Sequence, residues 1–291
     1  MLEINRNNNR KLLVSEVVRI LESGGIEDAR RNAEWMAEEV LGCSRLVLYA
    51  DSNRSVTEEE VARIDDMLRR RLQREPLQYI LGRADFFGLT LRVSGSVLIP
   101  RPETEQVVER ALQLLQATSA PRVLDVGTGS GCIPFAIKHE RPDAGVSACD
   151  VSLQALSVAR QNASTLGLEV ELFSADVLLD DFTDRVAGDL DLVISNPPYI
   201  PDSEAEQLSQ EVYGFEPHLA LFSGKDPLVF YRAIAHHANQ LLKPGAYILF
   251  EVHMDYARAV HELLEGNGYS EVRTSNDLAG RPRIVEGRWA Q

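Results

Sequence analysis

The spacing of apolar residues changes along the chain, and the first pattern is helical. The stretches 14–25, 26–42 and 55–73 each repeat apolar positions with the period of a helix that buries one face. The third stretch begins with Thr57 and Glu60, which are spaced as a capping box at a helix start. These patterns predict a small helical-bundle domain over residues 1–75.

Between residues 76 and 101 the pattern changes to alternating apolar and polar positions, with glycines between the apolar runs. Alternation is the period of a half-buried strand, so this segment predicts a β-hairpin linker. A further helix is predicted from Glu103 to about Gln116.

Beyond Pro121, strand-like apolar runs alternate with helical stretches to the end of the chain. This alternation is typical of a parallel sheet that helices cover on both faces. The last two strand-like segments follow each other directly, which predicts one antiparallel strand at the edge of the sheet. We therefore expect an α/β domain with a mostly parallel, doubly wound sheet over residues 102–291.

The composition of the chain bears on the class of its substrate and on its cellular location. The chain carries 30 Lys and Arg against 44 Asp and Glu, a net charge of −14, and this balance disfavours DNA or RNA as the main substrate. No apolar run is long enough to span a membrane, and the polar N-terminus lacks the apolar core of a secretory signal. The cysteines (Cys43, Cys132 and Cys149) and the histidines show no metal-ligand spacing. We expect a cytoplasmic protein without a membrane span or a bound metal.

A glycine-rich turn follows the first strand of the predicted sheet. Gly127, Gly129 and Gly131 alternate with Thr128 and Ser130, so a ligand can approach the backbone closely in front of a helix N-terminus. The G-x-G-x-G spacing differs from the G-x-G-x-x-G spacing of dinucleotide sites.

Acidic residues accompany three successive strands around this turn. Asp125 precedes the glycines, where it would attract the ammonium group of a methionine moiety and disfavour a pyrophosphate. Asp150 ends the second strand and could accept hydrogen bonds from ribose hydroxyls. Asp176 ends the third strand and could accept from an adenine amine, while Val177 packs on the ring. Together these residues predict S-adenosylmethionine rather than NAD as the cofactor.

Asn196, Pro197, Pro198 and Tyr199 follow the fourth strand, which the two prolines end. If the first and fourth strands are neighbours where the strand order reverses, Asn196 lies beside the methyl group of the cofactor. The Asn196 side-chain oxygen and the Pro197 carbonyl could hold the two N–H bonds of an amide or aromatic amine, and the Tyr199 ring could stack on it. The motif predicts methyl transfer to a planar nitrogen without a catalytic nucleophile.

Several stretches together resemble one family. "NPPY" after the fourth strand is similar to amino-methyltransferases that act on glutamine amides or on adenine N6. The segment from Pro76 to Glu105, with "DVGTGSG", "NPPYIP", "FEPHLALF" and "LAGRPRIV", resembles the bacterial release factor glutamine methyltransferase family in the same order. The resemblance implies a Rossmann-like methyltransferase sheet and an N-terminal domain for substrate recognition. It also implies methylation of the glutamine side-chain nitrogen, N5, in the Gly-Gly-Gln motif of class I peptide chain release factors.

The resemblance also implies roles for residues. The residues that would contact S-adenosylmethionine are 127–131, Asp150, Val177 and Asn196. Those that would hold the substrate glutamine are Asn196, Pro197, Pro198 and Tyr199, with Arg101 and Glu103 shaping the pocket. Two stretches depart from the family pattern: "SGKDPLVFYR", where the family often reads "GG-x-DGL", and "EVH" at 251–253, where it often reads "EIG".

The residues alone leave other functions open. An adenine-N6 methyltransferase of DNA or RNA would use the same motif on a flipped base, and it predicts a basic groove. A non-catalytic scaffold would bind S-adenosylmethionine without turning over an acceptor. An NAD-dependent reductase would be distinguished by a cofactor titration.

Overall fold

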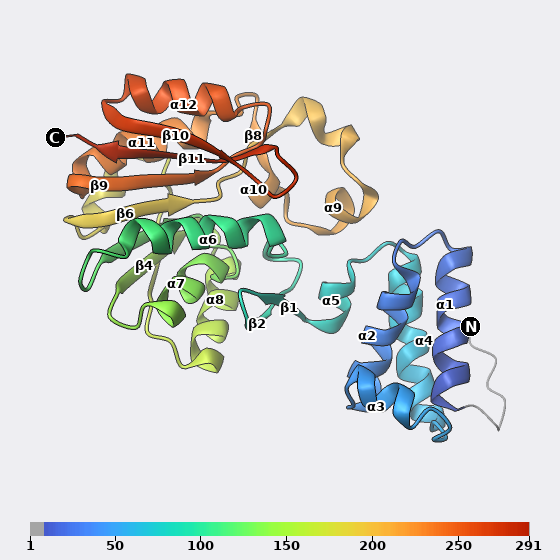
Figure 1. Cartoon of the computed structure of the whole chain (residues 1–291). Coiled ribbons are helices and arrows are strands. Elements are labelled where there is room, and N and C mark those ends of the chain that lie inside the picture. The colour runs from blue at the N-terminus through green and yellow to red at the C-terminus, as the bar shows by residue number, and fades with distance from the viewer. Residues whose placement is uncertain (1–8, 291) are drawn as a thin grey trace. The chain divides into compact units, whose positions relative to one another are not determined.

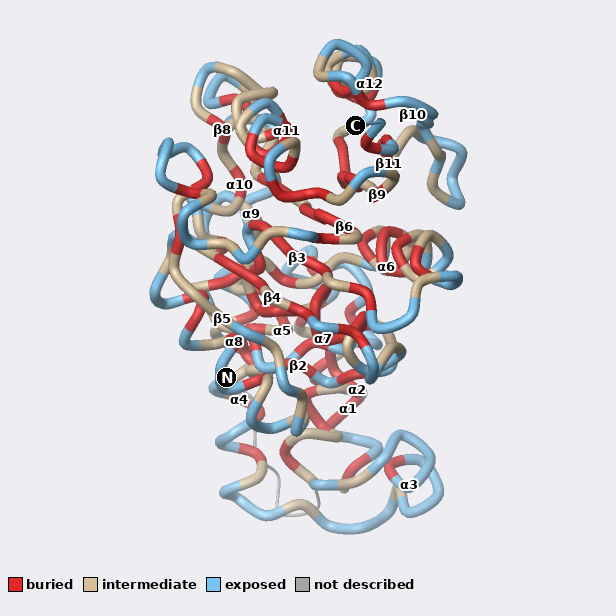
Figure 2. Tube along the Cα trace, turned by 90° about the vertical axis from the view of Figure 1, so that its left-hand side faces the viewer, coloured by how far each residue is buried: buried red, intermediate tan, exposed pale blue. Residues whose placement is uncertain are grey.

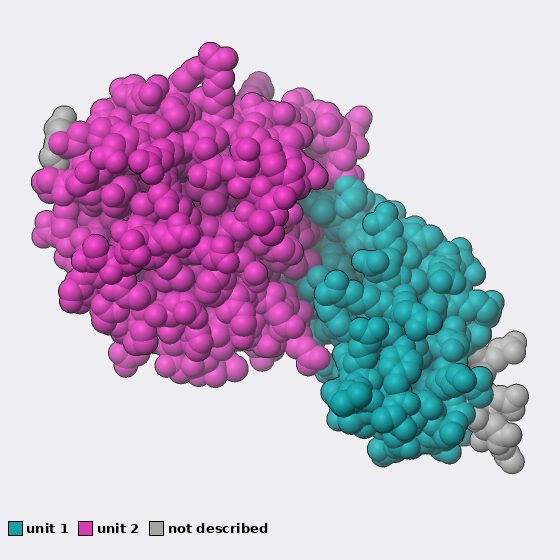
Figure 3. Space-filling view, viewed as in Figure 1, with its two compact units in different colours: residues 1–82, 209–215 teal, residues 83–208, 216–291 magenta. Residues whose placement is uncertain are grey.

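The computed structural model describes residues 9–290 and divides the chain into two compact units (Figure 3). The first unit comprises the chain up to Gly82 together with Ser209–Phe215, and the second comprises Arg83–Leu208 and the chain from Glu216 onward. The prediction that the N-terminus is not a secretory signal rests partly on residues 1–8, which lie outside the described residues. Within residues 9–290, no helix is both long and apolar enough to cross a membrane.

The first unit is a bundle of helices, and the helices α1, α2 and α4 each bury one face. Met36 and Ile64 lie fully buried in its core, on the faces that the apolar spacing predicts. The capping box is confirmed, because the Glu60 N–H donates to Thr57 Oγ1 at 3.1 Å and the Thr57 N–H donates to Glu60 Oε2 at 2.7 Å. The helices are α1 (Arg10–Ser23), α2 (Ala29–Leu41), α3 (Arg45–Ala50), α4 (Glu58–Leu72), α5 (Leu77–Leu81) and α9 (Gln210–Phe215).

The structure places the end of the first unit at Gly82 rather than at residue 75. Leu77–Leu81 forms helix α5, although the alternating pattern suggested strand-like backbone over part of this segment. Leu77 lies in the core of the first unit and Leu81 packs against it, so burial on a helical face overrides the alternation. The hairpin itself consists of β1 (Arg83–Phe86) and β2 (Leu89–Arg92), which pair antiparallel.

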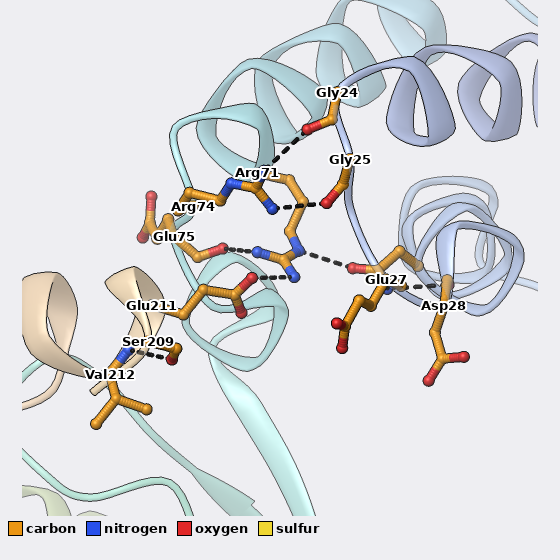
Figure 4. Close-up of polar contacts among 11 residues, drawn as sticks. Gly24, Gly25, Glu27, Asp28, Arg71, Arg74, Glu75, Ser209, Glu211 and Val212 are labelled. Atoms are coloured by element: carbon orange, nitrogen blue, oxygen red, sulfur yellow. Dashed lines mark hydrogen bonds and ion pairs between the residues drawn. The ribbon is translucent and has the colours of Figure 1, made fainter. Parts of the chain in front are cut away.

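A buried arginine joins separate segments of the first unit (Figure 4). Arg71, in the last turn of α4, is only 5% exposed. Its Nε donates to Asn32 Oδ1 at 2.8 Å, its Nη1 to the Glu75 carbonyl at 3.1 Å, and its Nη2 to Glu211 Oε1 at 2.8 Å. Glu211 belongs to α9, so this ion pair holds the inserted segment in the helical unit. A buried guanidinium is stable only with such partners, because burial removes its water.

We expect Arg71→Met to lower the free energy of unfolding of the first unit by about 2–4 kcal/mol, because its buried partners lose their shared donor. Urea unfolding followed by the fluorescence of Trp35, in a Trp289→Phe background, measures this unit. Arg69→Met is the matched control in the same helix, since the Arg69 side chain is 59% exposed; it should cost less than about 1 kcal/mol. Equal losses in the two variants would contradict the role of the buried network.

The second unit contains a seven-stranded sheet in the order β10-β11-β9-β6-β3-β4-β5 (Figure 1). Neighbouring strands from β5 to β9 are parallel, whereas β11 is antiparallel to both β9 and β10. The central strands β3 and β6 are buried along most of their length (Figure 2). The strands are β3 (Arg122–Val126), β4 (Gly145–Asp150), β5 (Glu171–Ser174), β6 (Leu190–Ser195), β9 (Leu242–Glu251), β10 (Tyr269–Asn276) and β11 (Pro282–Trp289).

The predicted α/β class is confirmed, but the position of the antiparallel strand needs correction. The sequence placed that strand at the edge, whereas β11 lies one strand inward and β10 forms the edge. The two burial patterns give the physical reason: the middle of β11 is buried, while most residues of β10 are exposed or half-buried. An apolar strand gains more from neighbours on both sides than a polar one does.

Two apolar cores cover the two faces of the sheet. On one face, α6, α7 and α8 pack against residues such as Val123 and Leu192. On the other, α11 and α12 pack against residues such as Leu124 and Val193, because successive side chains of a strand point to opposite faces. The helices are α6 (Pro102–Leu115), α7 (Cys132–Glu140), α8 (Leu153–Leu166), α11 (Val229–Leu241) and α12 (Ala257–Gly266). Shorter elements are η1 (Asp180–Arg185), β7 (Ile200–Pro201), η2 (Asp202–Gln207), α10 (His218–Leu221) and β8 (Phe222–Gly224).

Candidate active site

The ends of β3 and β6 lie side by side at the point where the strand order of the sheet reverses. β3 pairs in parallel with β4 on one side and with β6 on the other, so the condition under which Asn196 was placed beside the cofactor, that the first and fourth strands are neighbours, is met. The Ser195 hydroxyl donates to the Val126 carbonyl at 2.6 Å and joins the two strand ends. The glycine turn follows Val126 and Asn196 follows Ser195, so both motifs begin at one edge of the sheet. Open α/β sheets bind their ligands at this position.

A cavity of about 410 Å³ opens at this edge, within the second unit. Its volume is in the range of small-molecule and cofactor sites. It brings together most of the residues that the sequence singled out, from the ends of all four strands. These residues are Arg101, Gly127, Thr128, Gly129, Ser130, Asp150, Asp176, Val177, Asn196, Pro197 and Pro198.

Four of the predicted site residues do not line this cavity: Glu103, Asp125, Gly131 and Tyr199. Asp125 is only 1% exposed, and among the described residues only Thr128 lies near enough to lower the pKa of its carboxyl by hydrogen bonding; neither carboxylate oxygen makes a well-formed bond there. Burial raises the pKa of this carboxyl to about 7. Asp125 lies one residue before the end of β3, and its predicted contact with a cofactor stays a prediction. Glu103 lies in the first turn of α6, two residues after the N-cap residue Arg101.

The glycine turn is folded tightly around the end of β4. The N–H groups of Gly127 and Thr128 both donate to the Cys149 carbonyl, at 2.9 and 3.0 Å. Asp150 accepts from the Gly129 N–H through Oδ2 at 2.9 Å and from the Ser152 N–H through Oδ1 at 2.8 Å. Burial raises the pKa of Asp150 despite these bonds. Each carboxylate oxygen can accept a second bond, so Asp150 remains able to bind hydroxyls in the cavity.

Two buried hydroxyl groups in the cavity wall make no well-formed hydrogen bond within residues 9–290. They are Thr128 Oγ1, which lies near enough to Asp125 to lower the pKa of that carboxyl, and Ser130 Oγ, which lies near the Cys132 thiol. Buried polar groups are rarely left unbonded, so these atoms fit a polar ligand in the cavity. Asp176 adds an acceptor at the end of the same wall; its Oδ1 also accepts from the Leu178 N–H at 2.9 Å.

Tyr199 packs beside the cavity rather than in it. Its ring lies against the apolar core under α11 and contacts the His253 ring, with centroids 5.8 Å apart and planes inclined by 37°. His253 in turn contacts Tyr256, whose hydroxyl donates to Glu204 at 2.7 Å. The "EVH" departure therefore places an imidazole ring against the tyrosine of "NPPY". Burial raises the pKa of Tyr199 to about 12, so its phenol is neutral at physiological pH.

The sequence missed several walls of the cavity. Ser96, Val97 and Leu98 come from the segment after the hairpin, Leu219 comes from α10, and Phe230 comes from α11 in the "SGKDPLVFYR" departure. Most are apolar and carry no chemical signature of their own. The segment after the hairpin is fixed by Glu216, which is 4% exposed: it accepts from the Ile99 N–H at 3.3 Å and pairs with Arg101 Nη2 at 2.5 Å. Arg101 therefore lines the cavity and, through its ion pair with Glu216, also helps to fix the segment after the hairpin.

A buried carboxyl also lies beside the site, at the end of β9. Glu251 is 2% exposed, and Thr104, which lines the cavity, donates to its Oε2 at 2.6 Å. Burial raises the pKa of Glu251 to about 7. The protonated carboxyl is favoured in the folded state, so its contribution to stability is fully present below pH 4.5 and is lost as the pH rises to about 7.

We expect Glu251→Gln to remove part of this pH dependence. Glutamine keeps an acceptor for Thr104 and cannot ionise, so between pH 4.5 and 8 the wild type should lose roughly 2–4 kcal/mol of unfolding free energy relative to the variant. Urea unfolding across this pH range measures the difference. Glu109→Gln, at an exposed position of α6, is the control and should follow the wild type. A flat difference between wild type and Glu251→Gln would show that Glu251 ionises normally.

Comparison with known proteins identifies the class first. Residues 108–213 match the methyltransferase small domain and residues 13–82 match the PrmC N-terminal domain. Among solved structures, the hMettl16 catalytic domain in complex with MAT2A 3′UTR hairpin 1 superposes with a TM-score of 0.58 over 88% of this chain and 90% of that chain, at 16% identity. At this identity the likeness concerns the fold alone. The chain is a methyltransferase.

Curated relatives identify the family. The release factor glutamine methyltransferase of Chlorobaculum tepidum is 43% identical over 259 residues, which cover 87% of each chain. That of Bradyrhizobium diazoefficiens is 42% identical over 92% of this chain and 91% of its own. The chain belongs to the release factor glutamine methyltransferase family, as the sequence motifs indicated. Its cofactor is S-adenosylmethionine, and the buried hydroxyls and the acidic strand ends of the cavity fit that molecule.

Proposed function

We propose that this protein transfers a methyl group from S-adenosylmethionine to the side-chain amide nitrogen of the glutamine in the Gly-Gly-Gln motif of class I peptide chain release factors. The observation that carries the proposal is the shared cavity: Asn196 and Pro197 line the same space as the glycine turn. This shared cavity supports the proposal that a cofactor and an acceptor amide meet there. The proposal places the reaction in the cytoplasm, with the release factor as the protein partner.

On this proposal the cofactor is held by the residues of the strand ends. The hydroxyls of Thr128 and Ser130 bond to its methionine portion, Asp150 accepts from the ribose hydroxyls, and Asp176 accepts from the adenine amine beside Val177. Asp125 acts from behind the turn, through its charge when ionised. When bound, S-adenosylmethionine supplies an electrophilic methyl group on a positively charged sulfur.

The residues of "NPPY" orient the acceptor nitrogen. An amide nitrogen is a weak nucleophile because its lone pair is delocalised into the carbonyl. The Asn196 side-chain oxygen and the Pro197 carbonyl accept hydrogen bonds from its two N–H groups. These bonds orient the nitrogen so that its lone pair points at the methyl carbon. Held in this way, the nitrogen would accept the methyl group that S-adenosylmethionine supplies, the sulfur would keep the electron pair of the former carbon–sulfur bond, and the surplus proton on the nitrogen would pass to water. Both oxygens bind the nitrogen more strongly as it becomes cationic, which lowers the barrier.

Tyr199 supports this arrangement from beside the cavity. Its ring packs against the apolar core and His253, so it acts on the orientation of the turn as well as on any planar group that reaches it. Arg101 and Glu103 shape the entrance, Arg101 directly and Glu103 through the first turn of α6. We assign substrate recognition to the helical unit of residues 1–82 and 209–215.

Purified protein, labelled S-adenosylmethionine and a class I release factor test this function. We expect label on the factor and, after proteolysis, a single added methyl on the Gly-Gly-Gln peptide by mass spectrometry. A factor with Ala in place of that glutamine is the control and should stay unlabelled. A parallel reaction with DNA and RNA tests the adenine-N6 alternative; label on nucleic acid and none on the factor would overturn the proposal. The net charge of −14 and the family both favour the protein substrate.

A further inference from the structure

One buried amide joins two walls of the S-adenosylmethionine cavity without lining it. Asn162 lies on α8, is 1% exposed and does not face the cavity. An amide carries two N–H donors and one oxygen acceptor, and here all of them are used within the second unit. No motif of the sequence drew attention to this residue.

The first wall that Asn162 holds is the glycine turn. Its Nδ2 donates to the Ser130 carbonyl at 2.9 Å, between Gly129 and Gly131, which both adopt positive φ angles. Asp150 holds the same turn from the other side through the Gly129 N–H. Side chains therefore hold the turn at two successive residues, Asp150 at Gly129 and Asn162 at Ser130, and the Gly131 N–H closes it by donating to the Thr128 carbonyl at 2.9 Å.

The second wall is the segment that follows the hairpin. Asn162 accepts from the Arg92 N–H through Oδ1 at 2.7 Å and donates to the Arg92 carbonyl through Nδ2 at 3.1 Å. The Asn162 side chain thus binds both the N–H and the C=O of Arg92, as a neighbouring strand would, and fixes the chain where β2 ends. A few residues later Ser96, Val97 and Leu98 line the cavity, and the Ile99 N–H is bound by Glu216. The wall is therefore anchored at both ends, by Asn162 and by Glu216.

We propose that Asn162 is a positioning residue that fixes the separation of these two walls and so sets the affinity for S-adenosylmethionine. The same amide group binds Ser130 and Arg92, so a displacement of either wall weakens the contact to the other. The inference rests on the assignment of this cavity to S-adenosylmethionine. It does not require the proposed acceptor, because cofactor binding is measured without one.

The test compares Asn162→Ala with Asn239→Ala by calorimetric titration with S-adenosylmethionine. Asn239 is the matched control: it lies on α11 and donates to the Asn267 carbonyl at 3.3 Å, away from both walls. We expect Asn162→Ala to raise the Kd about tenfold, and Asn239→Ala to change it by less than about twofold. In a methylation assay the KM for S-adenosylmethionine should rise with the Kd, while kcat at saturating cofactor stays within about twofold of the wild type. A Kd within twofold of wild type in folded Asn162→Ala, or equal losses in both variants, would overturn the proposal.

A second measurement uses the unaltered protein, so it decides the matter even if Asn162→Ala does not fold. Hydrogen exchange is followed with and without S-adenosylmethionine. We expect the cofactor to slow exchange at the Arg92 amide together with the amides of the glycine turn, because Asn162 couples them. Slower exchange in the glycine turn with no change at Arg92 would refute the coupling.

Discussion

Asn196→Ala should retain much of the affinity for S-adenosylmethionine and lose methyl transfer by about 10²–10³-fold. The alanine removes one of the two oxygens that hold the acceptor nitrogen, and this interaction strengthens as positive charge develops on that nitrogen. Because Asn196 is one of many residues that line the cavity, binding of the cofactor should change little. Single-turnover transfer to the release factor and a separate cofactor titration measure the two quantities.

Asn196→Asp is the matched variant for this prediction. A carboxylate keeps an acceptor oxygen at nearly the same position, so Asn196→Asp should retain more transfer than Asn196→Ala. Parallel loss of cofactor binding and transfer in Asn196→Ala would mean that Asn196 chiefly anchors the cofactor. In that case the orientation of the acceptor must come from other residues.

Gly131→Ala should destabilise the second unit by about 2–5 kcal/mol and abolish most cofactor binding. Gly131 has φ of +84°, a left-handed conformation that costs any other residue energy. In addition, a Cβ at this position would lie 2.0 Å from Cε2 of Phe135, whose side chain is fully buried and cannot move aside freely. Gly131 therefore matters for the shape of the turn, although it does not line the cavity.

Gly88→Ala separates the two contributions. Gly88 also has a left-handed φ, of +76°, but nothing lies within 4 Å of a Cβ built there. Its substitution should cost only about 1–2 kcal/mol from backbone strain. Thermal unfolding and cofactor titration of both variants provide the comparison. Equal losses would show that the ring of Phe135 yields, and that the clash contributes nothing.

The fold was largely predictable because its periodicities are local. Helical spacing, the capping box at Thr57 and the alternation after Pro121 reflect which side of each element is buried. Helix α5 and the inward position of β11 were not predictable, because each depends on tertiary burial. Leu77 packs in the core of the first unit, and β11 pairs with a strand on each side. Periodicity alone does not say which neighbours an element meets.

The site was predictable where chemistry is concentrated in a short stretch. The glycine turn and "NPPY" are such stretches, and the structure brings both to one cavity. The apolar walls, such as Leu98 and Phe230, reach the cavity only through packing, and their residue types are common in any core. The burial of Asp125, one residue before the end of β3, was not predictable from its place beside the glycine turn, because burial depends on packing against the rest of the sheet.

The structure of a complex with S-adenosylhomocysteine and a class I release factor tests the central claim most directly. We predict that the glutamine side-chain nitrogen lies within hydrogen-bond distance of both Asn196 Oδ1 and the Pro197 carbonyl, facing the sulfur. A complex in which these two oxygens bind the cofactor or the protein instead, with the glutamine held elsewhere, would contradict the account.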